Sequence, residues 1–203
     1  MCKVKICGLS RKEDIDAVNR VLPDYIGFVF APSRRRVDEG TAAALRERLD
    51  GRIQSVGVFV NRDIEFVAGL YRKGVINLAQ LHGDENGEYV KRLKEMCGCP
   101  VIKSVGIGGA LPVLPEEPDY LLFDALSAQR GGTGEAFDWN VIKGYKTKPY
   151  FLAGGLTIEN LTGALKFLNP YCVDVSSGVE TDGVKDPGKI ENFIQIARSC
   201  SAE

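Results

Sequence analysis

Several features of large protein classes are missing from this sequence of 203 residues. It has one histidine, one tryptophan and a formal net charge of −1, and it has no long basic tract. Without such a tract we expect no nucleic-acid partner and no attraction to an anionic membrane surface. No apolar run approaches the roughly 20 residues that a membrane-spanning helix needs, and the first residues lack the zones of a secretory signal. These absences favour a cytoplasmic protein.

Cysteine is more frequent than usual, but its spacing does not indicate a metal site. No pair of cysteines has the CxxC spacing, and no cysteine and histidine have the CxxH spacing. The one close pair, Cys97 and Cys99, makes a poor zinc site with a single histidine. We therefore expect no metal, and free thiols in a reducing compartment. The six cysteines are Cys2, Cys7, Cys97, Cys99, Cys172 and Cys200.

Short apolar segments alternate with amphipathic ones along the chain. The apolar segments, interpreted as strands, are residues 2–7, 25–30, 53–60, 76–81, 101–105, 120–123, 150–153 and 172–175. The clearest helical segments are residues 40–49, 63–72, 88–96, 158–168 and 190–198. This alternation predicts an α/β fold with a parallel sheet. Eight units in about 200 residues favour a closed (β/α)8 barrel in one domain over residues 1–203, and an open doubly wound sheet is the alternative.

The fifth connection departs from this pattern. Between Val105 and Tyr120 the chain contains three prolines and three glycines. Proline lacks the backbone N–H that a helix needs, and glycine destabilises helix interiors. We therefore expect an irregular connection here in place of a helix.

Polar or reactive residues stand at the carboxyl ends of the predicted strands. In a barrel these ends share one rim, where active sites are built. Side chains alternate along a strand, so Lys5 shares a face with Cys7, Gln80 with His82 and Asp174 with Ser176. After the first strand, Ser10 and Glu13 predict a capping box that begins a helix. The strand-end residues are Cys7, Ser33, Arg34, Arg35, Arg36, Asn61, His82, Asp124, Gly154, Gly155, Ser176, Ser177 and Gly178.

The last two strands are each followed by a glycine turn and the start of a helix. Gly154 and Gly155 follow the seventh strand, and Ser176, Ser177 and Gly178 follow the eighth. Glycine lets backbone N–H groups approach an anion, and a helix N-terminus adds a favourable dipole. Because this pair of loops is the usual phosphate pocket of barrels, we expect phosphate binding, although two tight turns would look the same.

The other candidates each have a structural alternative. Cys7 is either a buried small residue or a thiolate base helped by Lys5, and Asp124 is either a cap or a general acid or base. One of the arginines at 34–36 is placed to bind a carboxylate. His82 makes either a structural hydrogen bond or a catalytic one. Residues 131–134, Gly-Gly-Thr-Gly, form either a lid or a flexible loop.

Taken together and in this order, ten blocks of the chain resemble the phosphoribosylanthranilate isomerase family of tryptophan biosynthesis, whose members are TIM barrels. The resemblance covers essentially the whole chain, and the joint occurrence of the blocks is highly specific. The blocks are residues 5–8, 27–30, 36, 56–61, 80–83, 124, 131–134, 137–139, 152–156 and 174–180.

The resemblance implies an Amadori rearrangement of N-(5-phosphoribosyl)anthranilate. Asp124 would protonate the furanose ring oxygen, and Cys7 as a thiolate would take the C2′ proton. Arg36 would pair with the anthranilate carboxylate, with Arg34 and Arg35 as competitors. His82 and Asp174 would contact substrate, or Asp174 would brace Cys7. The five residues of the glycine loops would bind phosphate, with no cofactor and no metal, in a monomer or homodimer.

Three other functions fit the sequence less well. A ribulose-phosphate epimerase needs several histidines and a metal, and this chain has one histidine. The aminoaldose isomerase of histidine synthesis has an aspartate at the end of the first strand, where this chain has Cys7. A non-catalytic barrel that senses phosphosugars would have lost the acid or the base, and both Cys7 and Asp124 are in place.

Overall fold

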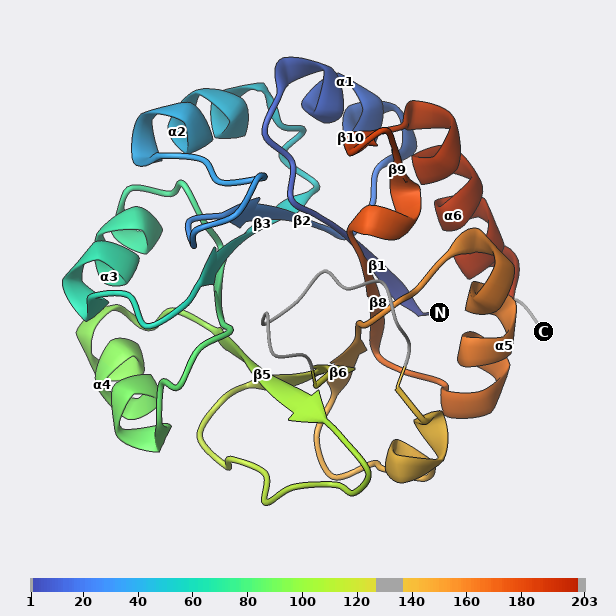
Figure 1. Cartoon of the computed structure of the whole chain (residues 1–203). Coiled ribbons are helices and arrows are strands. Elements are labelled where there is room, and N and C mark those ends of the chain that lie inside the picture. Colours follow the sequence, from blue (N-terminus) through green and yellow to red (C-terminus); the bar gives the residue numbers. More distant parts are fainter. Residues whose placement is uncertain (1, 127–136, 201–203) are drawn as a thin grey trace.

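Eight parallel strands form a closed barrel in the computed structural model, which describes residues 2–126 and 137–200 (Figure 1). The first and last strands pair, with Lys5 opposite Asp174, so the barrel prediction is confirmed and the open sheet is wrong. The strands are β1 Lys3–Cys7, β2 Tyr25–Val29, β3 Gln54–Phe59, β4 Leu78–Leu81, β5 Val101–Ile107, β6 Tyr120–Ala125, β7 Tyr150–Leu152 and β8 Cys172–Val175.

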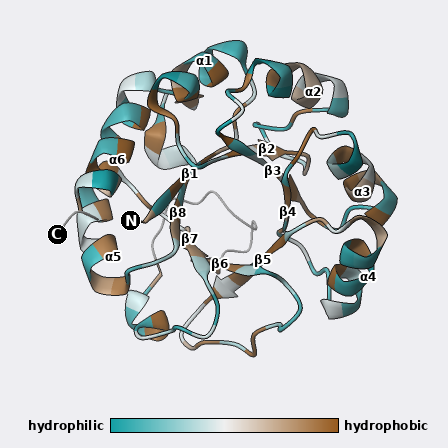
Figure 2. Cartoon of the chain, turned by 180° about the vertical axis from the view of Figure 1, so that it is seen from behind, coloured by the Kyte–Doolittle hydropathy of each residue, from teal (hydrophilic) through white to brown (hydrophobic). Residues whose placement is uncertain are grey.

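Helices ring the outside of the barrel and are striped with hydrophilic and hydrophobic residues (Figure 2). Their apolar sides pack on the strands, whose own residues are mostly buried on both faces, as expected for a parallel sheet. The helices of the described residues are α1 Lys12–Val21, α2 Glu39–Arg48, α3 Ile64–Arg72, α4 Gly87–Cys97, α5 Ile158–Leu168 and α6 Pro187–Ser199. The five predicted helical segments each correspond to one of them.

The connection between β5 and β6 contains no helix, which confirms the irregular fifth unit. Three prolines and two glycines lie between Ile107 and Tyr120, and in a helix each proline would remove a backbone hydrogen bond. Between β6 and β7, the described residues form only the short 3₁₀ helix η1, Trp139–Ile142.

The predicted capping box of Ser10 and Glu13 is wrong. The first helix begins one residue later, after Arg11, and the acidic side chain that reaches back belongs to Asp14. Asp14 accepts hydrogen bonds from the backbone N–H groups of Ser10 and Arg11, at 3.0 and 3.1 Å. The Arg11 guanidinium also pairs with Asp14, which is 2 % exposed. Asp14 can be buried because this arginine neutralises it.

The chain after β8 is more elaborate than predicted. It forms the 3₁₀ turn η2 Ser177–Val179 and then a small antiparallel hairpin of β9 Glu180–Thr181 and β10 Val184–Lys185. Helix α6 then begins at Pro187, with Asp186 as its N-cap, three residues before the predicted start. The hairpin brings Glu180 opposite Lys185 at the mouth of the barrel.

Candidate active site

The polar side chains at the barrel mouth lie two residues further along their strands than an apolar layer inside the barrel. Inside the barrel, one buried cluster includes Leu78, Ile102, Leu122 and Cys172. Two residues further along each of these strands, and therefore on the same face, stand Gln80, Ser104, Asp124 and Asp174. The interior changes from apolar to polar at the carboxyl ends of the strands, where the sequence predicts a site.

Cys7 ends β1, and its sulfur lies against Gly27 of β2. A Cβ atom on Gly27 would lie 2.6 Å from the sulfur, so glycine at this position makes room for the thiol. Burial raises the pKa of the Cys7 thiol above its ordinary value, Lys5 lowers it, Asp174 raises it and Lys185 lowers it. Without substrate, Cys7 is therefore a thiol, and the positive charges of Lys5 and Lys185 oppose the rise in its pKa that burial causes.

Lys5 and Asp174 form a buried ion pair between β1 and β8. Lys5 Nζ lies 2.7 Å from Asp174 Oδ2, and Lys5 is 0 % exposed. Burial lowers the pKa of Lys5, but the Asp174 carboxylate more than offsets this, so Lys5 remains a cation. Asp174 Oδ1 is buried and has no hydrogen-bond partner among the described residues. Asp174 thus contacts Lys5, whose side chain lies on the same face of β1 as Cys7.

Asp124 lies near the end of β6. Burial raises the pKa of Asp124 to about 6, although the Ala125 N–H, which donates to Oδ1 at 2.8 Å, lowers it. Asp174 raises this pKa and Lys5 lowers it, so the Lys5–Asp174 pair acts on both Asp124 and Cys7. A raised pKa keeps a carboxyl protonated where an ordinary aspartate is ionised, as a general acid requires.

His82 follows β4 and faces Asp124. Its Nε2 atom lies 3.6 Å from Asp124 Oδ2. Its Nδ1 atom lies 3.1 Å from Gln80 Nε2 and 2.6 Å from the Ser104 hydroxyl. The Gln80 and Ser104 contacts hold the Nδ1 edge of the ring, and the Nε2 edge is directed towards Asp124. His82 therefore makes structural hydrogen bonds and also lies beside Asp124. A structural role and a catalytic role for His82 are compatible with this arrangement.

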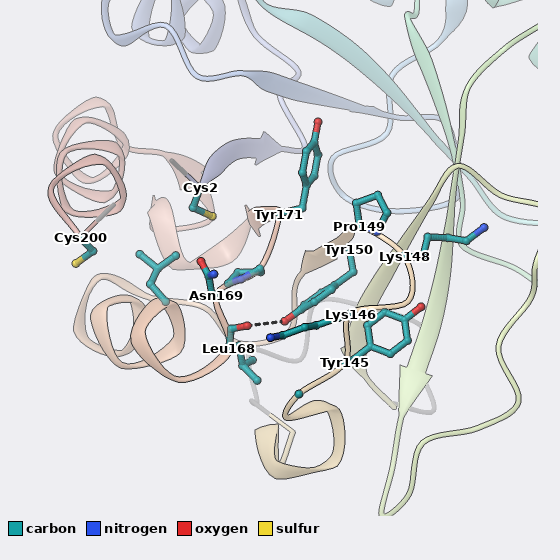
Figure 3. Close-up of a pocket in the computed structure, with 13 residues that line it drawn as sticks. Cys2, Tyr145, Lys146, Lys148, Pro149, Tyr150, Leu168, Asn169, Tyr171 and Cys200 are labelled. Atoms are coloured by element: carbon teal, nitrogen blue, oxygen red, sulfur yellow. Dashed lines mark hydrogen bonds between the residues drawn. The ribbon is translucent and has the colours of Figure 1, made fainter. Parts of the chain in front are cut away.

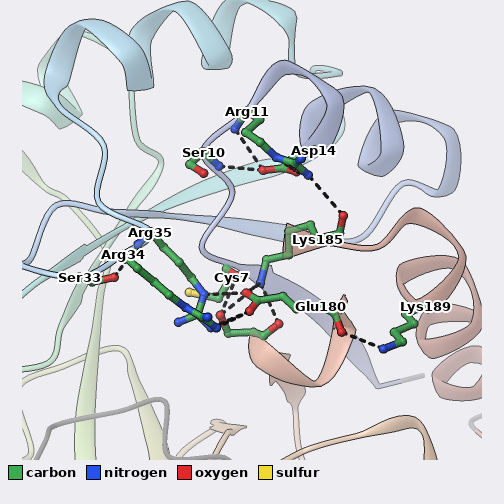
Figure 4. A network of polar contacts seen from close by, with 11 residues as sticks. Cys7, Ser10, Arg11, Asp14, Ser33, Arg34, Arg35, Glu180, Lys185 and Lys189 are labelled. Atoms are coloured by element: carbon green, nitrogen blue, oxygen red, sulfur yellow. Dashed lines mark hydrogen bonds and ion pairs between the residues drawn. The ribbon is translucent and has the colours of Figure 1, made fainter. Parts of the chain in front are cut away.

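The three arginines after β2 separate into two groups. Arg34 and Arg35 both bind Glu180, with contacts of 2.6 Å each, and Arg35 makes a second contact of 2.9 Å (Figure 4). Arg36 pairs in the backbone with Val29, is exposed, and makes no side-chain hydrogen bond or ion pair with the described residues. Of the three arginines, Arg36 is thus the one whose side chain has no hydrogen bond or ion pair among residues 2–126 and 137–200.

The two glycine loops lie in contact with each other. Gly154 and Gly155 have φ values of 78° and 61°, a left-handed region that suits glycine, and α5 begins shortly after them with Thr157 as its cap. A Cβ atom on Gly178 would lie 2.0 Å from the Leu156 carbonyl oxygen. Glycine at 178 is what allows η2 to approach the loop after β7.

Gly178→Ala is expected to separate these loops and weaken phosphate binding at least tenfold. The added methyl group meets backbone rather than a movable side chain, so the loop itself must shift, and overpacking of this kind costs about 1–3 kcal/mol. Calorimetric titration with inorganic phosphate measures the effect. Gly163→Ala in α5 is the control, because its Cβ meets nothing within 4 Å. Equal phosphate affinity in the two variants would contradict the assignment of these loops.

The structure adds residues that the sequence analysis did not assign. Ser104 holds His82, and Glu180 and Lys185 lie beside β1. Ser104 follows the alternation that marks Gln80 and Asp124, so that pattern could have found it. The predicted lid at 131–134 lies outside the described residues. Among residues 2–126 and 137–200, no group of three or more His, Cys, Asp or Glu side chains could hold a metal ion, and no helix could span a membrane.

A pocket of about 600 Å³ opens at the other end of the barrel (Figure 3). It is lined by residues that precede β7 and β8, including Lys146, Pro149 and Tyr171, and by Cys2 before β1. Tyr150 Oη closes one side by donating to the Leu168 carbonyl at 3.1 Å. Because the amino ends of the strands form this pocket, it is separate from the residues predicted for catalysis.

Curated proteins and solved structures resemble this chain over nearly its full length. A protein from Endomicrobium trichonymphae named N-(5'-phosphoribosyl)anthranilate isomerase is 49% identical over 200 residues, covering 98% of this chain and 100% of its own. One of the same name from Clostridium acetobutylicum is 46% identical over 205 residues, covering 98% of each. The phosphoribosyl anthranilate isomerase structure from Thermus thermophilus matches with a TM-score of 0.85, 36% identity and coverage of 97% and 98%.

A further solved structure contains a bound ligand. It is a phosphoribosyl anthranilate isomerase in complex with reduced 1-(o-carboxyphenylamino)-1-deoxyribulose 5-phosphate, with a TM-score of 0.82, 33% identity and coverage of 98% and 100%. The family model described as N-(5'phosphoribosyl)anthranilate (PRA) isomerase matches residues 4–196. The chain belongs to the N-(5'-phosphoribosyl)anthranilate isomerase family, whose enzymes isomerise N-(5'-phosphoribosyl)anthranilate in tryptophan biosynthesis.

Proposed function

We propose that this chain converts N-(5'-phosphoribosyl)anthranilate to 1-(2-carboxyphenylamino)-1-deoxyribulose 5-phosphate with Asp124 as acid and Cys7 as base. Asp124 gives its proton to the ring oxygen, the C1′–O bond breaks, and the nitrogen lone pair forms a protonated Schiff base. The Cys7 thiolate then removes the C2′ proton, and the electrons of that bond form an enolamine. Tautomerisation gives the ketone, so C1′ is reduced, C2′ is oxidised and no external oxidant is needed.

The observation that supports this proposal most is that one buried ion pair acts on both reactive groups. Lys5 and Asp174 influence the ionisation of Cys7 on β1 and of Asp124 on β6. A base and an acid that share neighbours can act on two atoms of one small sugar. The raised pKa of Asp124, about 6, suits the acid.

The remaining contacts supply binding at the two ends of the substrate. The loops with Gly154, Gly155, Ser176, Ser177 and Gly178 hold the phosphate through backbone N–H groups. Arg36, which binds no described side chain, pairs with the anthranilate carboxylate. Between the two ends of the substrate, Asp174 Oδ1 accepts a hydrogen bond from a sugar hydroxyl. His82 Nε2–H orients Asp124 or the substrate.

Arg36→Ala is expected to weaken anthranilate-bearing ligands by about tenfold or more, because a charge-assisted pair contributes roughly 1.5–3 kcal/mol. Simple sugar phosphates should bind almost as well as to the wild type, since they lack the carboxylate. Competitive inhibition constants for both kinds of ligand measure this. Arg62→Ala is a control with an exposed arginine that packs on Phe66. Equal weakening of both ligand types would assign Arg36 to the phosphate or to the fold.

The proposed activity is tested by following the fluorescence of the anthranilate substrate as purified protein consumes it. We expect consumption without added metal or cofactor, and growth of a tryptophan auxotroph that lacks this isomerase when it expresses the chain. An intact substrate signal together with no growth would contradict the proposal.

The setting of the reaction follows from the same proposal. We propose a cytoplasmic enzyme with a small phosphosugar substrate and without a nucleic-acid or membrane partner. We also propose that residues 1–203 form one domain that acts as a monomer or homodimer. Light scattering of the purified protein distinguishes the two assembly states.

A further inference from the structure

The hairpin after β8 lies between α1 and α6 at the rim of the barrel (Figure 1), and its residues Glu180 and Lys185 lie near Cys7 (Figure 4). It is fixed at its base by Arg11, whose guanidinium donates to the Lys185 carbonyl at 3.3 Å. The Lys185 side chain points the other way, into the protein, and is only 3 % exposed. A lysine this deeply buried needs a partner or a function, because removing an ammonium group from water is costly.

The charges around Lys185 do not balance. Glu180 accepts from Lys185 at 2.7 Å and also binds Arg34 and Arg35. Burial raises the pKa of Glu180, but Arg35 and Lys185 outweigh burial and lower it to about 2, so it is a carboxylate. Three cations therefore share one anion, and the cluster carries net positive charge. The Lys5–Asp174 pair on the other side of Cys7 has one charge of each sign.

Hydrogen bonds connect this positive cluster to Cys7. Lys185 Nζ donates to the Ser176 carbonyl at 2.7 Å and lies 3.3 Å from its hydroxyl. That hydroxyl donates in turn to the Cys7 carbonyl at 3.0 Å. The charged groups that act on the thiol are Lys5 on β1, Asp174 on β8 and Lys185 on β10, and the neighbouring strand β2 contributes the uncharged Gly27.

We propose that Lys185, held by Glu180 and the Ser176 carbonyl, is a positioning residue that stabilises the Cys7 thiolate in the isomerisation. Lys5 lowers the pKa of the Cys7 thiol more than Lys185 does, but Lys5 is paired with its own carboxylate, whereas Lys185 belongs to a cluster with excess positive charge. Lys185 also fixes the hydroxyl that holds the Cys7 backbone, so charge and geometry are supplied by one side chain. The inference rests on the proposed role of Cys7 as base.

The test measures the ionisation of Cys7 without relying on turnover. The thiolate, not the thiol, displaces iodide from iodoacetamide, so the alkylation rate follows the thiolate fraction. Mass spectrometry of the Cys7 peptide separates this thiol from the five other cysteines. In Lys185→Gln, which retains a donor but has no charge, we expect alkylation at pH 8 to be about tenfold slower, as one pKa unit implies. Lys185→Arg, which restores the charge, should recover much of the rate.

Lys189→Gln is the matched control. Lys189 also binds Glu180, but through its backbone carbonyl at 2.8 Å, and it is not among the groups with the largest effects on the pKa of the Cys7 thiol. Its alkylation rate should equal that of the wild type. If a thermal unfolding experiment shows that Lys185→Gln is not folded, Lys185→Met is the second variant, because methionine fills a similar space without charge. Alkylation in the uncharged, folded variant at the wild-type rate would overturn the proposal, even if activity fell.

The same experiment distinguishes this inference from the proposed function. If alkylation slows in Lys185→Gln but Cys7→Ala retains full turnover, Lys185 stabilises the thiolate and Cys7 is not the base, which overturns the catalytic part of the inference. If alkylation slows and kcat/KM falls in parallel, both stand. If neither changes, Lys185 has only a structural role.

Discussion

Cys7→Ala is expected to lower kcat by about 10²–10⁴-fold, the usual contribution of a positioned acid or base. Without the sulfur, no group at the end of β1 can take the C2′ proton. Phosphate affinity should remain close to the wild-type value, because the glycine loops after β7 and β8 are untouched. Steady-state kinetics and a phosphate titration on the same preparation measure the two effects.

The control for this substitution is Cys97→Ala. Cys97 ends α4 on the outside of the barrel, where its thiol donates to the Leu93 carbonyl. It should leave kcat unchanged. A loss below tenfold in Cys7→Ala would mean that the proton goes to another group. A parallel loss of phosphate affinity would mean that the substitution disturbs the fold of the mouth.

Asp124→Asn is expected to lower kcat by a similar 10²–10⁴-fold, since the amide cannot protonate the ring oxygen. The side chain keeps nearly the same shape, and its carbonyl oxygen can still accept from the Ala125 N–H. The substitution therefore removes the proton rather than the packing. Asp138→Asn, at the cap of η1, is an exposed control. Retention of more than a tenth of the wild-type kcat would argue for a different acid.

The pH dependence provides a sharper version of this prediction. The wild type needs Asp124 protonated and Cys7 ionised, whereas the pKa of Asp124 is about 6 and that of Cys7 is above its ordinary value. The form with Asp124 protonated and Cys7 ionised, which the reaction needs, is thus a small fraction of the enzyme at every pH. Its fraction is constant between the two pKa values, so kcat/KM should fall below pH about 6 and above the Cys7 pKa.

In Asp124→Asn, only the thiolate requirement remains. Residual kcat/KM should then rise with pH across the range where the wild type is flat, and level off above the Cys7 pKa. A pH–rate profile of both proteins tests this. A variant profile that keeps the wild-type plateau above pH about 6 would show that a group other than Asp124 produces the fall below it.

The barrel and the positions of most strand-end residues were predictable from the two-residue alternation of side chains along strands. Strand side chains alternate, so a polar residue two positions after a buried apolar one lies on the same interior face. This applies to Asp124 after Leu122 and to Asp174 after Cys172. The irregular fifth connection was predictable for a local reason, since its prolines exclude a helix.

The cluster around Glu180 was not predictable from such local rules. Arg35 and Glu180 are 145 residues apart, and only closure of the barrel brings them together. One sequence signal was present and unused. Asp182 and Gly183 both have positive φ, and an Asp-Gly pair favours the two-residue turn of a hairpin. That signal predicts the turn, but not that Lys185 then lies beside Cys7.

The start of α1 illustrates a different limit. Ser10 and Glu13 have the spacing of a capping box, but Asp14 takes the role because Arg11 pairs with it. Spacing alone cannot show which of two adjacent carboxylates has a cation beside it.

The most direct test of the account is a crystal structure of this chain with reduced 1-(o-carboxyphenylamino)-1-deoxyribulose 5-phosphate. We expect the Cys7 sulfur about 3–4 Å from C2′ and an Asp124 carboxylate oxygen within about 3 Å of the former ring oxygen, as proton transfer requires. The phosphate should lie on the backbone N–H groups near Gly155 and Ser177. A ligand that contacts neither Cys7 nor Asp124, or that reaches only one of them, would contradict the central claim.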